Sequence, residues 1–264
     1  MNPFFRYLFN CNRKKLAFFY CGFIAICSLL LFHMKSSLKI EDTLRLDMTL
    51  GIFLVLLWIA SLFILFIALL YFNKSLKKSM LRYTAVSSQK IIYANLFFFT
   101  FWFLFLMIIG LIFLYYFSLS IDGGKTIGDL QQEYHMLYDY GIFYHVLSVF
   151  LWGIDFMSIL VSCYFIIVIT KLISIRSLMG EMILFIILIS LFLKIKTSIM
   201  YVLSNLERYA VNIKNIDFID ENGFIDVSLY PSEGFTILNL CFTFLFIIVL
   251  TTITGNIMDK KLEI

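Results

Sequence analysis

Six long apolar runs constrain the fold of this chain more than any other feature of its sequence. A helix needs about 20 apolar residues to cross the ~30 Å hydrocarbon core of a bilayer. Within that core every backbone N–H and C=O has to be paired inside the protein, which leaves only helices and closed barrels. The runs are continuous rather than alternating, so they predict an all-α membrane protein with six transmembrane helices. A single transmembrane domain of residues 1–264 is expected, with spans at about residues 16–32, 49–72, 91–119, 141–170, 178–195 and 235–254.

The composition argues against a soluble protein and against several classes of function. Of all residues, 62% are hydrophobic and 14% are charged, with a mean hydropathy of +0.95. A soluble domain carries about a quarter charged residues, and it cannot leave large apolar patches facing water. The five cysteines show no disulfide framework and no metal-ligand spacing. In a membrane protein a net charge of +4 reflects topology, so no nucleic-acid partner is expected.

The lysines and arginines predict the orientation of the chain. Thirteen of the 21 fall in segments on the same side as the N-terminus, and eight fall in the alternate segments. Lys194 and Lys196 are counted among the eight, because the fifth apolar run is taken to end near them. Cytoplasmic segments carry the excess of basic residues. We therefore expect a multi-pass protein of the cell membrane with both termini in the cytoplasm.

Two further segments have helical amphipathic patterns. Pro3–Lys15 combines apolar pairs four residues apart with four basic residues, which predicts an interfacial helix at the inner surface; a frayed tail is the alternative. After the short fifth run, apolar residues recur at steps of three and four over 197–213. This pattern predicts an outer helical insert before the last span. The short fifth run that leads into it suggests a helix that stops or turns before it crosses the membrane cleanly. An acidic, turn-rich loop is expected over Asp217–Gly234.

Asp155 is the one acidic residue well inside a predicted span. A charged side chain at the centre of a transmembrane helix costs about 2.5–3.5 kcal/mol on insertion scales, so it should face the bundle interior or an aqueous cavity. Asp155 is therefore either a pathway or coupling residue, or a buried residue that holds helices together. The sequence shows no second charged residue at a matching depth, which favours helix packing.

No catalytic or cofactor-binding motif is complete in this chain. Gly123-Gly124-Lys125-Thr126 resembles the end of a phosphate-binding loop, but the glycine required at position 119 is Leu119. No nucleophile motif, zinc-protease motif or pair of intramembrane acids is present. We therefore expect no enzymatic activity, no metal and no cofactor in this chain.

The segment 73–90 between the second and third spans is the longest inner connection, and it carries five basic residues and no acid. Residues 85–92, which join the end of this segment to the start of the third span, resemble the corresponding loop of ABC-2 type transporter permeases. Ser87, Lys90 and Ile91 fit that pattern, while its Leu-Pro pair is replaced by Thr84-Ala85. The order of spans, the N-terminal amphipathic segment and the outer insert extend the resemblance over the whole chain.

The resemblance implies a half-transporter that pairs with a second permease, identical or homologous, in contact with membrane lipid. Separate cytoplasmic ATP-binding subunits would hold ATP and Mg and supply the driving force. Among such permeases the chain is most similar to those of low-GC Gram-positive bacteria that export antimicrobial or cytolytic peptides or confer immunity to them. The expected cargo is therefore an amphipathic peptide or a hydrophobic toxin.

The same resemblance places the contact to the ATP-binding subunit in residues 73–90, which we call the basic loop. Leu76, Met80 and Tyr83 lie three to four residues apart and would give a short helix one apolar face for docking. The alternative is that the lysines only enforce topology and contact anionic lipid, at about 1 kcal/mol each. The predicted coupling residues are Lys77, Lys78, Met80, Arg82, Tyr83, Ser87 and Lys90.

Three other functions compete with the permease interpretation. An ion-coupled secondary transporter or channel should have broken helices and several intramembrane charges, and Asp155 nearly alone argues against it. A membrane-embedded enzyme lacks a paired catalytic set. A non-transporting scaffold subunit stays open.

Overall fold

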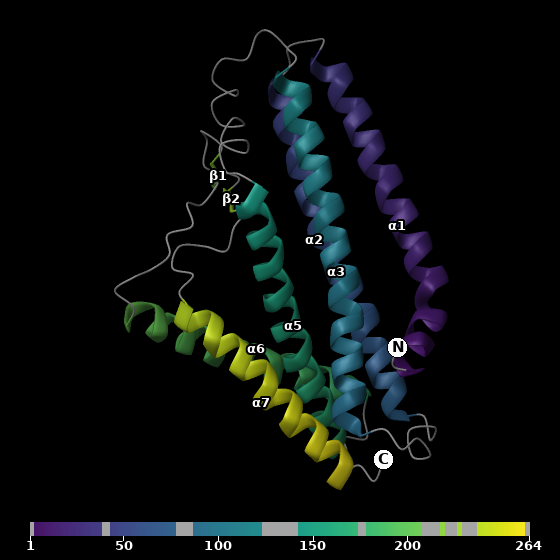
Figure 1. Cartoon of the computed structure of the whole chain (residues 1–264), viewed down its shortest axis with the longest axis vertical. Helices are drawn as coiled ribbons and strands as arrows, with labels where there is room; N and C mark the ends of the chain where they lie inside the picture. Colours follow the sequence, from purple (N-terminus) through teal and green to yellow (C-terminus); the bar gives the residue numbers. More distant parts are fainter. Residues whose placement is uncertain are drawn as a thin grey trace.

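The computed structural model describes residues 3–38, 43–77, 87–122, 142–173, 178–206, 217–219, 226–228 and 237–261. These residues form long helices and one short strand pair (Figure 1). The helices are α1 (Pro3–Leu38), α2 (Thr43–Lys77), α3 (Ser88–Asp122), α5 (Ile142–Ile173), α6 (Leu178–Leu206) and α7 (Ile237–Lys261). Strands β1 (Asp217–Ile219) and β2 (Asp226–Ser228) pair antiparallel, with Phe218 opposite Val227. The sequence pattern did not predict this strand pair.

The prediction of an all-α membrane fold is confirmed. Among the described residues, six helices are long and apolar enough to cross a bilayer. Their apolar segments are Arg6–His33, Met48–Leu76, Ser88–Tyr116, Val146–Ile173, Met179–Leu203 and Ile237–Lys260. Each of these segments overlaps one of the apolar runs in the sequence.

Helices α3 and α5 form the centre of the bundle. Helix α3 packs against α1, α2, α5 and α7, and α5 packs against α2, α3, α6 and α7. Stacked rings join the central helices: Phe103 of α3 lies 4.2 Å from Phe156 of α5, and Phe72 of α2 lies 4.0 Å from Tyr164 of α5. Such ring pairs contribute about 0.5–1.5 kcal/mol each beyond the area that they bury.

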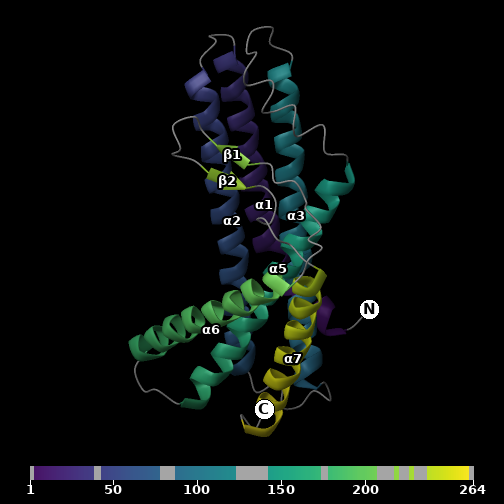
Figure 2. The same cartoon turned by 90° about the vertical axis from the view of Figure 1, so that its left-hand side faces the viewer.

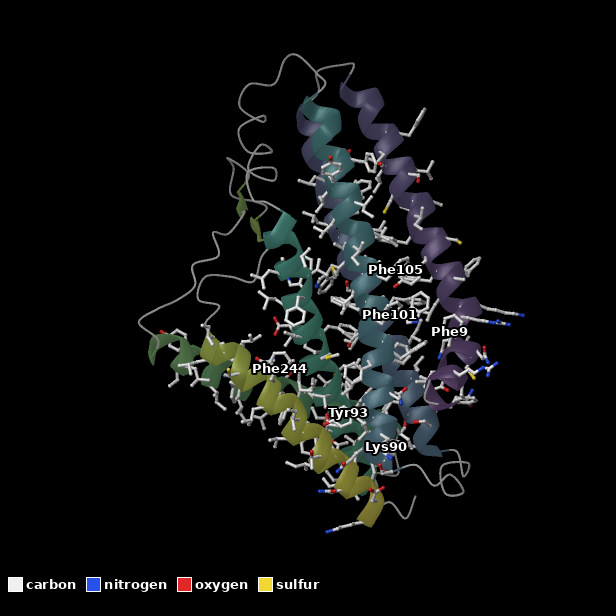
Figure 3. All side chains as sticks on the ribbon, in the orientation of Figure 1. Phe9, Lys90, Tyr93, Phe101, Phe105 and Phe244 are labelled. Atoms are coloured by element: carbon white, nitrogen blue, oxygen red, sulfur yellow. The ribbon has the colours of Figure 1, made fainter. Side chains whose placement is uncertain are left out.

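Helix α1 packs on α3 through a cluster of aromatic side chains. The hydroxyl of Tyr20 donates a hydrogen bond to the backbone carbonyl of Trp102. The ring of Tyr20 also contacts the rings of Trp102 and Phe105, at 5.3 Å and 5.2 Å between centroids. Phe105 lies on the side of α3 that faces α1 (Figure 3). The contact gives a tyrosine hydroxyl at membrane depth the acceptor that it requires.

Helix α6 differs from the others in direction and in burial. It runs at a steep angle to α1, α2 and α3 (Figure 2), and its main contacts are with α5 and α7. In its most apolar stretch 6% of the residues are buried inside the chain, against 61% for α5. One face of α6 therefore presents apolar side chains away from the bundle: Met182, Ile183, Ile186, Ile187, Leu191 and Ile195.

Both amphipathic segments are continuous with neighbouring spans. Pro3–Lys15 is helical and runs into the first span as part of α1, with Leu8, Asn12 and Leu16 on its buried face. The expected stop or turn after the fifth run is wrong, because α6 continues without a break to Leu206. No glycine or proline occurs between residues 180 and 223 to interrupt it. The predicted helix is thus present over 197–206, and residues 207–213 lie outside the described residues.

The helices define two ends of the bundle. Helix α1 begins and α7 ends at the same end (Figure 1). Because successive helices alternate in direction, α2 and α5 also end there, while α3 and α6 begin there. We call this the basic end, since the described residues Lys74, Lys90, Lys171 and Lys260 lie there.

Candidate functional site

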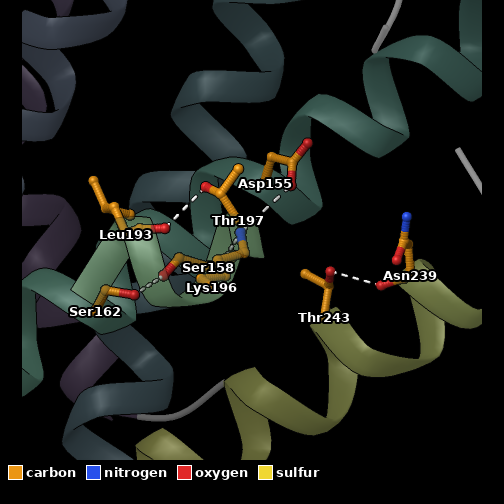
Figure 4. Close-up of polar contacts among 8 residues, drawn as sticks. All are labelled: Asp155, Ser158, Ser162, Leu193, Lys196, Thr197, Asn239 and Thr243. Atoms are coloured by element: carbon orange, nitrogen blue, oxygen red, sulfur yellow. Dashed lines mark hydrogen bonds and ion pairs between the residues drawn. The ribbon is translucent and has the colours of Figure 1, made fainter. Parts of the chain in front are cut away.

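Asp155 has a charged partner within the membrane-spanning part of the bundle. The carboxylate oxygen Oδ1 of Asp155 on α5 lies 3.8 Å from Nζ of Lys196 on α6 (Figure 4). Lys196 also donates a 2.6 Å hydrogen bond to Oγ of Ser158, and its ammonium lies 5.9 Å from the ring centroid of Phe246 on α7. The site therefore joins α5, α6 and α7.

The helical repeat explains why one lysine reaches both groups on α5. Asp155 and Ser158 are three residues apart, so their side chains share one face of the helix. Lys196 extends toward that face from α6 and is enclosed, with 9% of its side chain exposed, whereas 44% of the Asp155 side chain is exposed. The ammonium is held inside the bundle, and the carboxylate is open on one side.

This ion pair corrects the conclusion that no second charge lies at the depth of Asp155. The sequence pattern places Lys196 in an outer segment, but the residue lies inside the apolar segment Met179–Leu203. Two opposite charges within hydrocarbon compensate each other, whereas either charge alone is costly. The apolar residues Phe192, Ile195 and Ile199 continue the helical spacing of the fifth run. This continuity is the signal in the sequence that the span extends past Lys196.

The hydroxyl groups around the pair are occupied by their own helices. Ser162 donates to the carbonyl of Ser158 at 2.7 Å, Thr197 to that of Leu193 at 2.9 Å, and Thr243 to that of Asn239 at 2.8 Å (Figure 4). Within the described part of the chain, Lys196 is the one cation within 4.0 Å of Asp155. The carboxylate accepts no hydrogen bond from any described residue, so it keeps acceptor capacity for a further donor.

A row of phenylalanines borders the ion pair. Phe192 of α6 lies 5.6 Å from Phe246 of α7 and 5.7 Å from Phe165 of α5. Phe242, one turn before Phe246, lies 5.9 Å from it. We call Phe165, Phe192, Phe242 and Phe246 the aromatic row. Ring faces attract cations, as the position of Lys196 over Phe246 illustrates.

A second group of polar contacts lies at the basic end, where α3 begins. The carbonyl of Ser87 accepts hydrogen bonds from the N–H groups of Lys90 (3.0 Å) and Ile91 (3.3 Å). The N–H and the hydroxyl of Ser88 both donate to the carboxylate of Asp259 on α7. A carboxylate is favourable at this position because the first N–H groups of a helix are unpaired and carry partial positive charge.

The neighbouring residue strengthens the same link between helices. Nε2 of Gln89 donates to Oδ1 of Asn256 at 3.3 Å, one turn before Asp259 on α7. We call these interactions of Ser88 and Gln89 with Asn256 and Asp259 the α3–α7 contact. The sequence pattern did not reveal it, because the partners are separated by 167 and 171 residues.

The structure places part of the predicted coupling group beside this contact. Ser87 directly precedes α3, and Lys90 lies in its first turn; both are exposed. Lys77 is the last residue of α2. The remaining predicted coupling residues, Lys78, Met80, Arg82 and Tyr83, lie outside the described residues.

Another ion pair connects α5 and α6 at the basic end. Nζ of Lys171 lies 2.8 Å from Oε2 of Glu181, across the short connection between the two helices.

As for metal binding, the described residues contain no group of three or more His, Cys, Asp or Glu side chains that could hold an ion. Residues 123–126, which resemble the end of a phosphate-binding loop, lie outside the described residues.

Comparisons with protein-family models, with curated proteins and with solved structures found no match to this chain.

Proposed function

We propose that this chain is the membrane-spanning permease subunit of an ATP-binding-cassette transporter. It pairs with a second permease in the cell membrane, with both termini in the cytoplasm. Separate cytoplasmic subunits bind ATP and Mg and drive export of amphipathic peptides or hydrophobic toxins. The chain itself hydrolyses no ATP.

The observation that carries the proposal is the α3–α7 contact directly after the basic loop. A permease without an ATPase of its own has to receive force through its cytoplasmic surface. Movement of the loop acts first on the start of α3, which Asp259 and Asn256 tie to α7. The stack of Phe103 on Phe156 ties α3 to α5 as well. A partner that binds at residues 73–90 is thus connected to the helices that carry the intramembrane ion pair.

The chemistry of the loop supports docking of a protein. Five of its 18 residues are basic, which suits an acidic groove on the partner, and Met80 and Tyr83 supply apolar anchors. Removal of the two anchors leaves every positive charge in place, so attraction to anionic lipid and the membrane topology are preserved. Anchor removal therefore separates docking from the effects of charge.

The test uses the double variant Met80→Ala/Tyr83→Ala in the complete chain. We expect the affinity for the ATP-binding subunit, read from co-purification, to fall about thirtyfold, because truncation of two interface anchors costs about 1 kcal/mol each. Met48→Ala/Tyr116→Ala is the matched control, since it removes the same residue types from exposed positions away from the loop. Unchanged complex formation and unchanged coupled ATPase activity in the loop variant would refute docking.

A second candidate function is ion-coupled secondary transport, and the ion pair of Asp155 and Lys196 favours it. An isolated intramembrane acid argues against such a transporter, whereas Asp155 paired with Lys196 is not isolated. The two candidates differ in their energy source. Uptake or release by the purified chain in liposomes, driven by an ion gradient without ATP-binding subunits and lost in Asp155→Asn, would replace the permease proposal.

A further inference from the structure

The two members of the intramembrane ion pair differ in access. Lys196 is enclosed by α5, α6 and α7, with 9% of its side chain exposed, whereas 44% of the Asp155 side chain is exposed. An exposed carboxylate at membrane depth is unfavourable against lipid tails, and it becomes favourable when a donor group covers it. The exposed side of Asp155 is therefore stabilised by an occupant that brings hydrogen-bond donors.

The existing partner leaves room for such an occupant. The Nζ–Oδ1 separation of 3.8 Å is too long for a hydrogen bond, while the 2.6 Å bond from Lys196 to Ser158 is short. The face of Phe246 also holds the ammonium. Lys196 thus keeps two of its three neighbours when a different cation takes the carboxylate.

We propose that Asp155 binds the ammonium or guanidinium group of an organic cation, which replaces Lys196 as the partner of the carboxylate. Lys196 is then a tethered counter-ion that neutralises Asp155 when the site is empty. In transport, the bound cation is the charged group of the cargo, and this assignment rests on the proposed function. The binding of an organic cation to Asp155 does not depend on that function.

The surroundings select an organic cation over a metal ion. One carboxylate beside a lysine cannot supply the several oxygen ligands that a hard metal ion requires, and the described residues contain no larger group of ligating side chains. Ammonium and guanidinium groups instead donate directed hydrogen bonds to a carboxylate. The aromatic row offers ring faces for the charge and apolar surface for the attached hydrocarbon.

Displacement of Lys196 from Asp155 by the bound cation has a measurable consequence for the affinity of the site for cations. With the lysine displaced, the site carries one more positive charge than before, so Lys196 competes with the cation and repels it. Removal of Lys196 should therefore tighten binding of a cation, whereas removal of Asp155 should weaken it. A purely structural ion pair predicts no such opposite effects.

The experiment uses the complete chain in lipid nanodiscs with radiolabelled hexylammonium as the probe and empty nanodiscs as the background. We expect saturable binding that becomes about tenfold weaker in Asp155→Asn, since a charge-assisted hydrogen bond is lost. In Lys196→Met binding becomes about threefold tighter, because an internal competitor is removed. Glu181→Gln is the matched control, since it removes a carboxylate that also pairs with a lysine but lies at the basic end, and it leaves binding unchanged.

Chemical labelling identifies the site independently. Dicyclohexylcarbodiimide reacts with carboxyl groups in apolar surroundings, and mass spectrometry of the peptide that contains Asp155 reports the modification. Hexylammonium should protect Asp155 from the reagent, and hexanol at the same membrane concentration should not. Equal protection by the neutral alcohol would overturn a site for cations.

Two further results would overturn the inference. One is hexylammonium binding in Asp155→Asn that equals that of the unchanged chain. The other is weaker binding in a Lys196→Met variant that has the same thermal stability as the unchanged chain. If Asp155→Asn does not fold, the neutral pair Asp155→Asn/Lys196→Met supplies the comparison, because no uncompensated charge remains. No ATP-binding subunit is present in these measurements, so their failure is distinct from failure of the proposed coupling.

Discussion

At the scale of single residues, Gly255 of α7 lies directly against Gln89 of α3. A Cβ atom at this position would lie 2.4 Å from Cγ of Gln89 and 3.2 Å from its backbone nitrogen. The side chain of Gln89 can rotate away, but its backbone cannot. Glycine at position 255 therefore lets α3 and α7 approach at this point without displacing Gln89.

We predict that Gly255→Ala destabilises the protein by about 1–3 kcal/mol, the usual effect of overpacking a tight contact. The measurement is the thermal unfolding midpoint of the purified chain in detergent. Gly22→Ala is the matched control, since a Cβ at Gly22 meets nothing within 4 Å. Alanine there should be neutral or stabilising by roughly 0.5–1 kcal/mol, because it favours the helix. A Gly255→Ala variant as stable as Gly22→Ala would contradict the close approach.

Asp259 gives a second prediction at this scale. Asp259→Ala removes the acceptor for both the N–H and the hydroxyl of Ser88, so it should cost about 0.5–2 kcal/mol, as loss of a helix cap does. The unfolding midpoint should fall accordingly. Lys260→Ala, at the next position and exposed, serves as the control and should change it little. Equal midpoints for the two variants would show that the carboxylate does not cap α3.

At the scale of elements, α6 is the helix whose course the apolar pattern described least well. Its amides past Leu193 lie in an unbroken helix, so each is bonded to a carbonyl four residues earlier. We predict that amides of residues 194–203 exchange hydrogen as slowly as those of residues 183–193. The measurement is hydrogen exchange of the chain in nanodiscs. Fast exchange that begins at Lys194 would place a break where the short apolar run ends.

The long helices could be predicted because their cause is local. A continuous apolar run has to satisfy its own backbone in hydrocarbon, and this requirement alone specifies a helix. The end of α6 could not be predicted in this way, because a lysine normally marks the end of a span. Lys196 is tolerated inside the bundle since Asp155 and Ser158 of another helix receive its ammonium. That compensation depends on tertiary packing.

Of the candidate site, only Asp155 could be predicted from the sequence, because only its signal is local. Asp155 stands out in the sequence because an acid inside a span is costly wherever it points. Its partner, the aromatic row and the α3–α7 contact come from helices that are far apart along the chain. The Phe, Ser, Gln, Asn and Asp residues are ordinary at these positions, and Lys196 resembles the lysines that end a span. Only the folded arrangement brings them together.

At the scale of the whole molecule, the orientation of the bundle is open to a direct test. We predict that the basic end faces the cytoplasm, because cytoplasmic segments carry the excess of lysine and arginine. Single cysteines are introduced at Lys90 and at His33, both exposed, in a chain without its native cysteines. In intact cells a membrane-impermeant maleimide should label position 33 and leave position 90 unlabelled until the cells are opened. Labelling of position 90 from outside would reverse the topology.

The cap of α3 also sets an order of events during synthesis. Ser88 and the carboxylate that caps it are 171 residues apart, and Asp259 belongs to α7. At about 5–20 residues per second, roughly 10–30 s separate the translation of the two residues. Throughout that interval the start of α3 lacks its acceptor from α7. A chain whose α7 is not yet made therefore presents a different surface at the basic end from a chain in which Asp259 caps α3.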